Sequence, residues 1–194
     1  MKTLTATLGL LSLAAAAHAA PVQWSAASGG NDHYYEFVTI ATTWDSASAD
    51  AQSRTYDGLT GHLLTLTSQE EKDFVNTSLL SGANTWLGAQ RDGSSNAFIW
   101  AVGPEAGLVF YDGGLVGGVY SSFWGGEPNG QFSGENHVEM WGNNWNDMPG
   151  NQARAYVVEY SAVTAAPVPL PASGLMLVAG LGALGIGRSR RKAG

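Results

Sequence analysis

Residues 127–147, "EPNGQFSGENHVEMWGNNWND", concentrate side chains that could bind a cation. The stretch holds the acids Glu127, Glu135, Glu139 and Asp147 and several asparagines, and it has no lysine or arginine. Like charges that folding brings together are relieved by protonation, by pairing with basic side chains or by binding a metal ion. Because the stretch supplies no base of its own, its sequence favours a bound metal.

The donor types narrow the choice of metal. The donors are carboxylate and carboxamide oxygens, the chain has no cysteine, and His137 is the only histidine of the stretch. Calcium takes six to eight oxygen ligands, whereas zinc prefers nitrogen and sulfur and magnesium needs a stricter octahedral geometry. Calcium is therefore the metal that fits. Composition alone leaves a second interpretation open, because asparagine, aspartate and glycine also cluster in solvated turns.

The N-terminus has the features of a secretory signal peptide over residues 1–19. Lys2 precedes an apolar run from Leu8 to Ala17, and Ala17-His18-Ala19 is a small-x-small cleavage site. We therefore expect the chain to be exported.

The C-terminus, residues 163–194, begins as a proline-rich linker and continues as an apolar, glycine-rich segment. It ends with a basic cluster, Arg188, Arg190, Arg191 and Lys192. An ordinary membrane tail anchor would have the same composition. The order of Val168-Pro169-Leu170-Pro171-Ala172, the apolar segment and the arginines resembles the PEP-CTERM sorting tag. That resemblance implies a Gram-negative bacterium, membrane association through the tail, processing by an exosortase-like protease, and a place in the cell envelope, cell surface or extracellular matrix.

Between these ends, residues 20–162 are long enough for one domain. All 16 acidic residues of the chain lie there, with only four of the nine basic residues. This excess of negative charge argues against nucleic acid and anionic membranes as partners and suits a cation. Without cysteine, neither disulfides nor thiol catalysis are available.

Hydrophobic patterning predicts an α+β domain. A capping box, Ser68 and Glu71, opens a helix that continues to Leu80. An earlier helix is expected within 43–55, and 103–134 has the length and glycine content of a functional loop. The predicted strands are 34–40, 61–67, 84–90, 97–103, 137–141, 143–147 and 155–161.

Several motifs recur in one order along this domain. Trp86-Leu87-Gly88-Ala89, "FIWAVGPEAG", "FWGGEPN", "WNDMPG" and "YVVEY" together resemble the bacterial branch of the C-type lectin-like domain. The resemblance covers 34–160 and implies two helices, small antiparallel sheets and a long calcium-binding loop. The disulfides usual in that family are absent, and His137 and Gly150 stand about where one of them would be.

The resemblance also implies a ligand set. One calcium ion would be held by Glu127, Asn129, Glu135, Asn146 and Asp147, the last through both its carboxylate and its backbone carbonyl. The first four would also hydrogen-bond a carbohydrate. Glutamate followed by asparagine, as at Glu127 and Asn129, implies mannose-type sugars, whereas glutamine followed by aspartate at these two positions accompanies galactose. The acids of an accessory site are missing, since Gly130 and Asn136 stand there, so we expect a single ion.

The sequence thus predicts an exported, calcium-dependent carbohydrate-binding protein. The alternative is an adhesive or structural domain that keeps calcium for rigidity and binds protein. We do not expect an enzyme, because no nucleophile lies beside a histidine. His33 and His62 are expected at the surface or a strand edge, and His137 packed rather than metal-bound. The expected core tryptophans are Trp86, Trp100, Trp141 and Trp145. Trp124, beside the site, is also expected in the core, with contact to the ligand as the alternative.

Overall fold

The structure is a computed structural model that describes residues 20–93 and 95–162. The predicted signal peptide and sorting tag lie outside these residues. No helix within the described ranges is long and apolar enough to cross a membrane. The elements are β1 (Val22–Gln23), η1 (Ala26–Ser28), β2 (Tyr34–Thr42), α1 (Trp44–Ser53), β3 (Thr55–Tyr56), β4 (Leu59–Leu63), α2 (Gln69–Val75), η2 (Asn76–Leu80), β5 (Thr85–Arg91), β6 (Ala97–Trp100), β7 (Val109–Asp112), β8 (His137–Trp141), β9 (Asn144–Met148) and β10 (Arg154–Tyr160).

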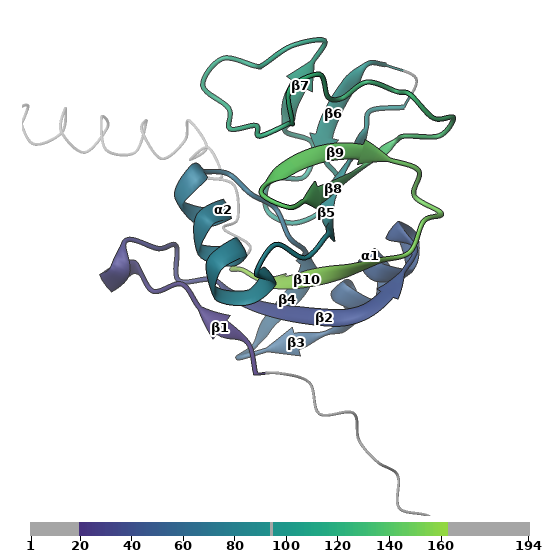
Figure 1. Ribbon diagram of the computed structural model, residues 1–194. Helices are drawn as coiled ribbons and strands as arrows, with labels where there is room; N and C mark the ends of the chain where they lie inside the picture. Colours follow the sequence, from purple (N-terminus) through teal and green to yellow (C-terminus); the bar gives the residue numbers. More distant parts are fainter. Residues whose placement is uncertain (1–19, 94, 163–194) are drawn as a thin grey trace, which may run out of the picture. The chain divides into compact units, whose positions relative to one another are not determined.

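The strands form one connected sheet rather than the several small ones that we predicted. Its main path is β1-β2-β10-β5-β6-β7, and β8 pairs with β5 and β9 (Figure 1). The first and last long strands, β2 and β10, pair antiparallel, while β10 and β5 pair parallel. Strand patterning could not show this mixed character, because it reports which face a residue occupies and not the direction of its neighbour.

Both predicted helices form, and each begins at a side-chain cap. The hydroxyl of Thr43 accepts from the Ser46 N–H before α1, and that of Ser68 accepts from the Glu71 N–H before α2. The second helix widens into the π-helical turn η2 and ends at Leu80, as the capping box and apolar pattern predicted. The α+β expectation is therefore confirmed.

Two expected core tryptophans are on the surface instead. Trp86, Trp100 and Trp145 are buried, but Trp124 is 54% exposed and Trp141 52% exposed. Along β8, Met140 points into the core, so strand alternation turns Trp141 outward. The two exposed rings lie against each other, with centroids 6.4 Å apart.

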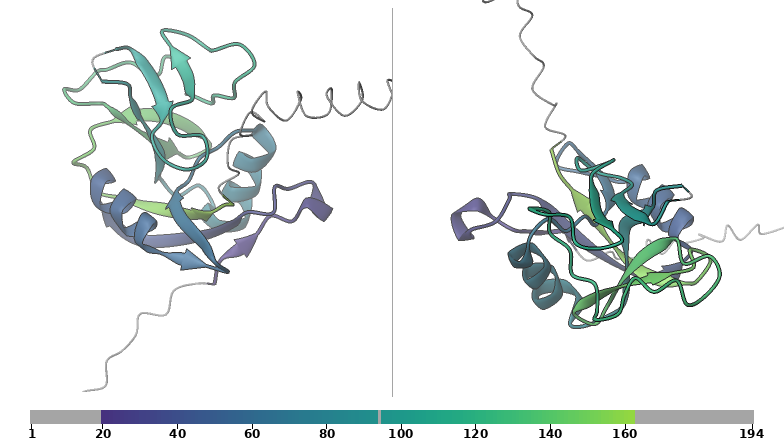
Figure 2. Two further views of the ribbon diagram at one scale, coloured as in Figure 1. Left: turned by 180° about the vertical axis from the view of Figure 1, so that it is seen from behind. Right: turned by 90° about the horizontal axis from the view of Figure 1, so that it is seen from above.

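The long loop joins the sheet at the edge of β9. The Trp145 N–H donates to the Ser122 carbonyl, and the Trp124 N–H donates to the Trp145 carbonyl. Lys72 of α2 fastens the same place, since its ammonium donates to the Ser122 hydroxyl and the Asn143 carbonyl. Figures 1 and 2 show the long loops beyond β6 to β9, away from β2 and β3. These contacts bring residues 127–135 beside β9.

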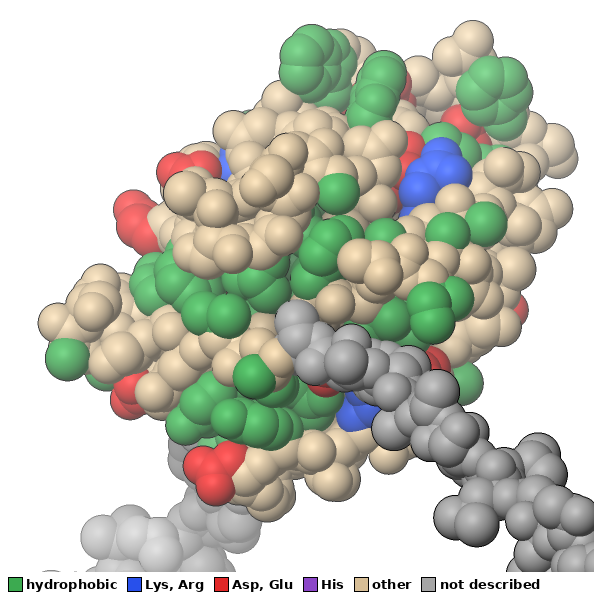
Figure 3. Space-filling view, turned by 60° about the horizontal axis from the view of Figure 1, so that its bottom comes forward, with side chains coloured by type: hydrophobic (Ala, Val, Ile, Leu, Met, Phe, Trp, Pro, Cys, Tyr) green, Lys and Arg blue, Asp and Glu red, His purple; other side chains and the backbone are tan. Residues whose placement is uncertain are grey.

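The face of the domain on the side of β2 and β3 carries both apolar and polar side chains. Figure 3 shows hydrophobic side chains there in several groups separated by polar surface, with basic side chains at a few small places. The exposed apolar residues of β1, β2 and β3 include Ile40 at 66% exposure and Tyr56 at 37%, whose ring packs against that of Tyr34. Isolated exposed apolar residues are ordinary on a folded domain and do not define a binding surface.

Candidate functional site

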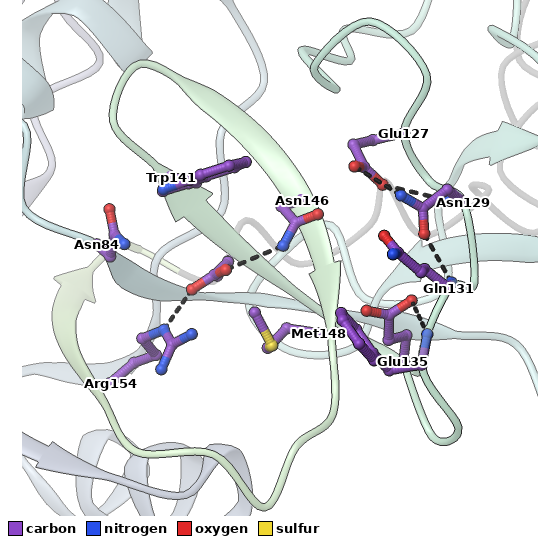
Figure 4. A pocket seen from close by; sticks show the side chains of 11 residues that line it. Asn84, Glu127, Asn129, Gln131, Glu135, Trp141, Asn146, Met148 and Arg154 are labelled. Carbon is purple, nitrogen blue, oxygen red and sulfur yellow. Dashed lines mark hydrogen bonds and ion pairs between the residues drawn. The ribbon is translucent and has the colours of Figure 1, made fainter.

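The five predicted ligand residues come together at one place. Glu127, Asn129, Glu135 and Asn146 line a cavity of about 340 Å³ (Figure 4). Asp147 is fully buried and does not line the cavity, but its two carboxylate oxygens accept from the backbone N–H groups of Asn129 and Gly130 at 3.1 Å each. Residues from a loop and a strand thus meet at one cavity.

The register of the β8–β9 hairpin explains how two consecutive residues, Asn146 and Asp147, both take part in the site. Asn146 is paired with Glu139 and Asp147 with Val138 across the two strands. Because successive side chains of a strand point to opposite faces, Asn146 lines the cavity while Asp147 lies on the buried side of β9. The loop reaches both residues, since Asn129 lines the cavity with Asn146 and its backbone N–H donates to Asp147.

Glu139 sets the orientation of Asn146. The Asn146 amide nitrogen donates to Glu139 Oε1 at 3.0 Å, and the other carboxylate oxygen is ion-paired with Arg154 Nε. With its nitrogen held on that side, Asn146 turns its carbonyl oxygen toward Glu127 and Asn129 (Figure 4). Glu139 and Arg154 therefore act as positioning residues, a role that the sequence did not indicate.

The loop holds its own acidic side chains in place. Glu127 accepts from the Asn129 amide nitrogen at 2.8 Å and from the Asn129 backbone N–H at 3.1 Å. Glu135 accepts from the Phe132 N–H at 3.0 Å. These local bonds fix the carboxylates near each other without neutralising their charge.

The electrostatics of the site partly correct the sequence argument. Two bases do reach the stretch from elsewhere: Arg154 pairs with Glu139, and Arg91 Nη2 lies 3.7 Å from Asp147 Oδ2. These arginines belong to β10 and β5, so the local sequence could not reveal them. In the described part of the chain, Glu127 and Glu135 form no ion pair with lysine or arginine.

The unpaired acids suit a cation. Burial, followed by the hydrogen bond and charge of Asp147 and the charge of Glu135, raises the pKa of Glu127. A raised carboxyl pKa means that the charged form is disfavoured among its neighbours, and a divalent ion would relieve that repulsion. The donors are carboxylate and carboxamide oxygens, which are the ligands of calcium. The residues present therefore fit calcium.

His137 packs as predicted. Its ring lies 4.7 Å from that of Trp44, and it fills the space above Gly150, where an added Cβ would come within 2.4 Å of its Nδ1. The imidazole thus occupies the place beside the loop where the C-type lectin-like resemblance puts a disulfide.

A second polar cluster was not predicted. His33, Glu71 and Glu159 place one ligand-type atom each within 4.8 Å of one another, and both acids are almost fully buried. His33 Nδ1 lies 2.7 Å from Glu159 Oε1, and the Tyr35 hydroxyl donates to Glu71 Oε1 at 2.8 Å. The cluster joins β2, α2 and β10, so only the fold assembles it.

His62 also differs from expectation. It is 6% exposed, and its ring nitrogens lie 2.9 Å from the Leu63 carbonyl oxygen and 2.7 Å from the Ser161 hydroxyl. The prediction that it lies at the surface is wrong. The neighbouring residues of β4 are buried as well. Hydrogen-bond partners for both ring nitrogens make burial of the imidazole possible.

The Glu71 cluster predicts a pH-dependent stability. Burial and the charge of Glu159 raise the pKa of Glu71 from 4.5 to about 7. Burial lowers the pKa of His33, but Glu159 outweighs it and the net pKa is raised. Both groups therefore bind protons more tightly when folded, and stability should fall as pH rises from about 5 to 8. We expect Glu71 to contribute on the order of 2 kcal/mol to this loss.

Urea unfolding of the Glu71→Gln variant at pH 5 and pH 8, with chelator present, measures that contribution. The variant should lose most of the difference between the two pH values, because glutamine cannot ionise. The neighbouring exposed residue gives a matched control, Glu70→Gln, which should keep the difference. A Glu71→Gln variant with the full wild-type pH dependence would refute this account of the cluster.

Comparison with known proteins places the chain in a family. The family model described as "Lectin C-type domain" matches residues 40–160. The chain therefore belongs to the C-type lectin domain family. This match includes both helices and the whole candidate site.

Individual relatives agree. The chain is 38% identical over 136 residues to halomucin of Haloquadratum walsbyi, covering 68% of this chain but 1% of halomucin. It is 30% identical over 166 residues to a C-type lectin of Thrasops jacksonii, a lectoxin, covering 78% of this chain and 93% of that one. The similarity to halomucin thus concerns a small part of a much longer protein.

Solved structures share the fold. The cow C-type carbohydrate-recognition domain of CD23, crystallised with a GlcNAc2Man3 oligosaccharide, is 27% identical with a TM-score of 0.54, covering 69% of this chain and 91% of that one. The C-type lectin CEL-I of Cucumaria echinata is 25% identical with a TM-score of 0.52, covering 68% and 92%. A Ca²⁺-dependent type II antifreeze protein, 18% identical with a TM-score of 0.53 over 68% and 94%, supports the fold alone.

Proposed function

We propose that this protein is an exported lectin that binds carbohydrate with the help of one calcium ion. The observation that carries the proposal is that Glu127, Asn129, Glu135 and Asn146 line one cavity, and that the buried Asp147 accepts from the Asn129 N–H beside it. Membership of the C-type lectin family supports it, as does the similarity to the CD23 carbohydrate-recognition domain. We propose binding and not catalysis, because the acids of the site serve the cation.

The bound cation would attract hydroxyl oxygens of the sugar, and the side chains would set which hydroxyls fit. Glu127 and Glu135 can accept hydrogen bonds, and Asn129 and Asn146 can donate them. Each asparagine amide already donates once, to Glu127 and to Glu139 respectively. Since a carboxamide nitrogen carries two hydrogens, each keeps one for a ligand. In the C-type lectin-like domain that the motifs resemble, this order of acceptors and donors accompanies two adjacent equatorial hydroxyls, as on mannose, glucose or fucose.

We also propose the route of the protein from its ends. The signal peptide would direct export across the inner membrane of a Gram-negative bacterium. The C-terminal tag would hold the protein at the membrane for an exosortase-like protease and sort it to the envelope, cell surface or extracellular matrix. Both proposals rest on the sequence, since these residues lie outside the described structure.

Titration calorimetry with methyl α-mannoside tests the sugar proposal, in calcium and again in chelator. We expect binding in the millimolar range, on the order of −4 kcal/mol, in calcium only, because a shallow site makes few contacts. Methyl α-galactoside, with the 4-hydroxyl reversed, should bind more weakly. Protein that binds calcium but no hexose at concentrations on the order of tens of millimolar would reject the sugar proposal. The adhesive, protein-binding alternative would then remain.

A further inference from the structure

The candidate cavity extends beyond the predicted calcium ligands. Figure 4 shows Glu127, Asn129 and Glu135 at one end, Asn146 near the middle, and a second end formed by Asn84, Trp141 and Arg154. Resting on the proposed lectin function, we propose that this second end is a subsite for an uncharged pyranose. The ligand would be an oligosaccharide whose first ring binds at the calcium end.

Trp141 provides the platform of this subsite. It projects from the outer face of β8 and is 52% exposed, and it is backed by Trp124, which is 54% exposed. Burying a tryptophan is strongly favourable, so two adjacent exposed rings leave an apolar surface that a ligand can cover. A pyranose presents C–H groups on a face and hydroxyls at its rim. It can therefore stack on an indole ring while its rim reaches polar groups.

The rim of the second end offers N–H donors. The Asn84 carboxamide oxygen accepts from the Gly142 N–H at 3.2 Å, which leaves its nitrogen to donate elsewhere. Arg154 uses Nε for Glu139 and Nη1 for the Ala153 carbonyl. Its Nη2 forms no hydrogen bond with another residue of the described chain. These donors complement the ring and hydroxyl oxygens of a sugar.

Charge favours a neutral sugar over a uronate. The guanidinium of Arg154 is balanced by Glu139, whose second oxygen already accepts from Asn146. A sugar carboxylate that reached Nη2 of Arg154 would lie near the Glu139 carboxylate and be repelled by it. A neutral ring avoids this repulsion.

The dimensions of the cavity also suit more than one ring. Its volume of about 340 Å³ lies in the range that holds drug-sized ligands, about 300–1,000 Å³. Trp141 follows Glu139 by two residues on the same face of β8, which separates them by roughly 7 Å. Glu139 is itself paired with Asn146 across the hairpin. Trp141 therefore lies two residues along β8 from Glu139, the residue that is paired with the candidate calcium ligand Asn146.

Calorimetry on the full-length chain in calcium tests this subsite with matched ligand pairs: methyl α-mannoside with mannobiose, and methyl β-glucoside with cellobiose. At least one disaccharide should bind about tenfold more tightly than its monosaccharide partner. Trp141→Ala should reduce that ratio to about twofold or less, and Trp141→Phe should keep most of it. Leu115→Ala removes another exposed apolar side chain, 76% exposed and outside the cavity lining, and should leave the ratio unchanged.

The outcomes separate the two proposals. If hexoses bind but no disaccharide binds more tightly than its monosaccharide, the subsite is overturned and the lectin function stands. The same holds if Trp141→Ala keeps the higher affinity for the disaccharide. If a glucuronate-containing disaccharide binds more tightly than the monosaccharide and the neutral disaccharides do not, the assignment of a neutral ring is wrong. If no hexose binds in calcium, the lectin function fails and the subsite with it. Melting temperatures of the variants check that each one folds.

Discussion

Replacing Asp147 with asparagine is expected to weaken calcium binding by roughly two orders of magnitude, since the charge of the ligands largely sets calcium affinity. Asp147 is fully buried and holds the loop through the N–H groups of Asn129 and Gly130. Asparagine has nearly the same size but no charge, and it keeps one acceptor for those N–H groups. The substitution also removes one of the two acceptors and the charge opposite Arg91, so some loss of stability without calcium is expected beside the loss of calcium affinity.

Calcium titration calorimetry of the Asp147→Asn variant measures this effect. Asp112→Asn is the matched control: the residue is exposed, at the end of β7, and does not line the cavity. The control should bind calcium as the wild type does. Melting both variants in chelator separates loss of fold from loss of affinity. Wild-type affinity in Asp147→Asn would exclude this aspartate as a ligand.

Exchanging the donor and acceptor of the first ligand pair should change the sugar. In the double variant Glu127→Gln, Asn129→Asp, the net charge of the cluster is unchanged, so calcium should still bind. The order of acceptor and donor presented to the two hydroxyls is reversed. A hydroxyl pair that meets the wrong order leaves a buried group unsatisfied, at about 1–3 kcal/mol. We therefore expect a shift of at least tenfold from mannose toward galactose.

Competition of the two methyl hexosides for the immobilised variant measures this shift. The single variant Glu127→Gln is the control, because it removes one negative charge and should lose calcium affinity. A double variant that retains calcium and still prefers mannose would show that these two side chains do not choose the sugar. The C-type lectin resemblance in the motif order would then not extend to specificity.

Local features of this fold could be predicted because local contacts determine them. The Ser68 cap needs only the N–H three residues later, and strand alternation follows from side-chain period. The five candidate ligands could be named because the C-type lectin-like resemblance assigns them to two short motifs and the glutamate between them. Whether they hold calcium remains a prediction.

The features that were missed depend on residues far apart in the chain. Arg91 and Arg154 reach the acidic stretch from β5 and β10, and the buried His33 cluster joins three elements. The exposure of Trp141 was missed for a different reason. Tryptophan type alone suggested burial, whereas the strand period placed the ring outside, and that side is where the proposed second sugar would bind.

A calcium titration of the full-length protein, followed by calorimetry and by thermal melting, tests the central claim most directly. We predict heat of binding that corresponds to one calcium ion per chain. The proposed ligands of this ion are Glu127, Asn129, Glu135, Asn146 and Asp147. We also predict a rise in melting temperature of about 5–10 °C when free calcium exceeds its dissociation constant a hundredfold. A protein that releases no heat with calcium and melts at the same temperature in calcium and in chelator would contradict it.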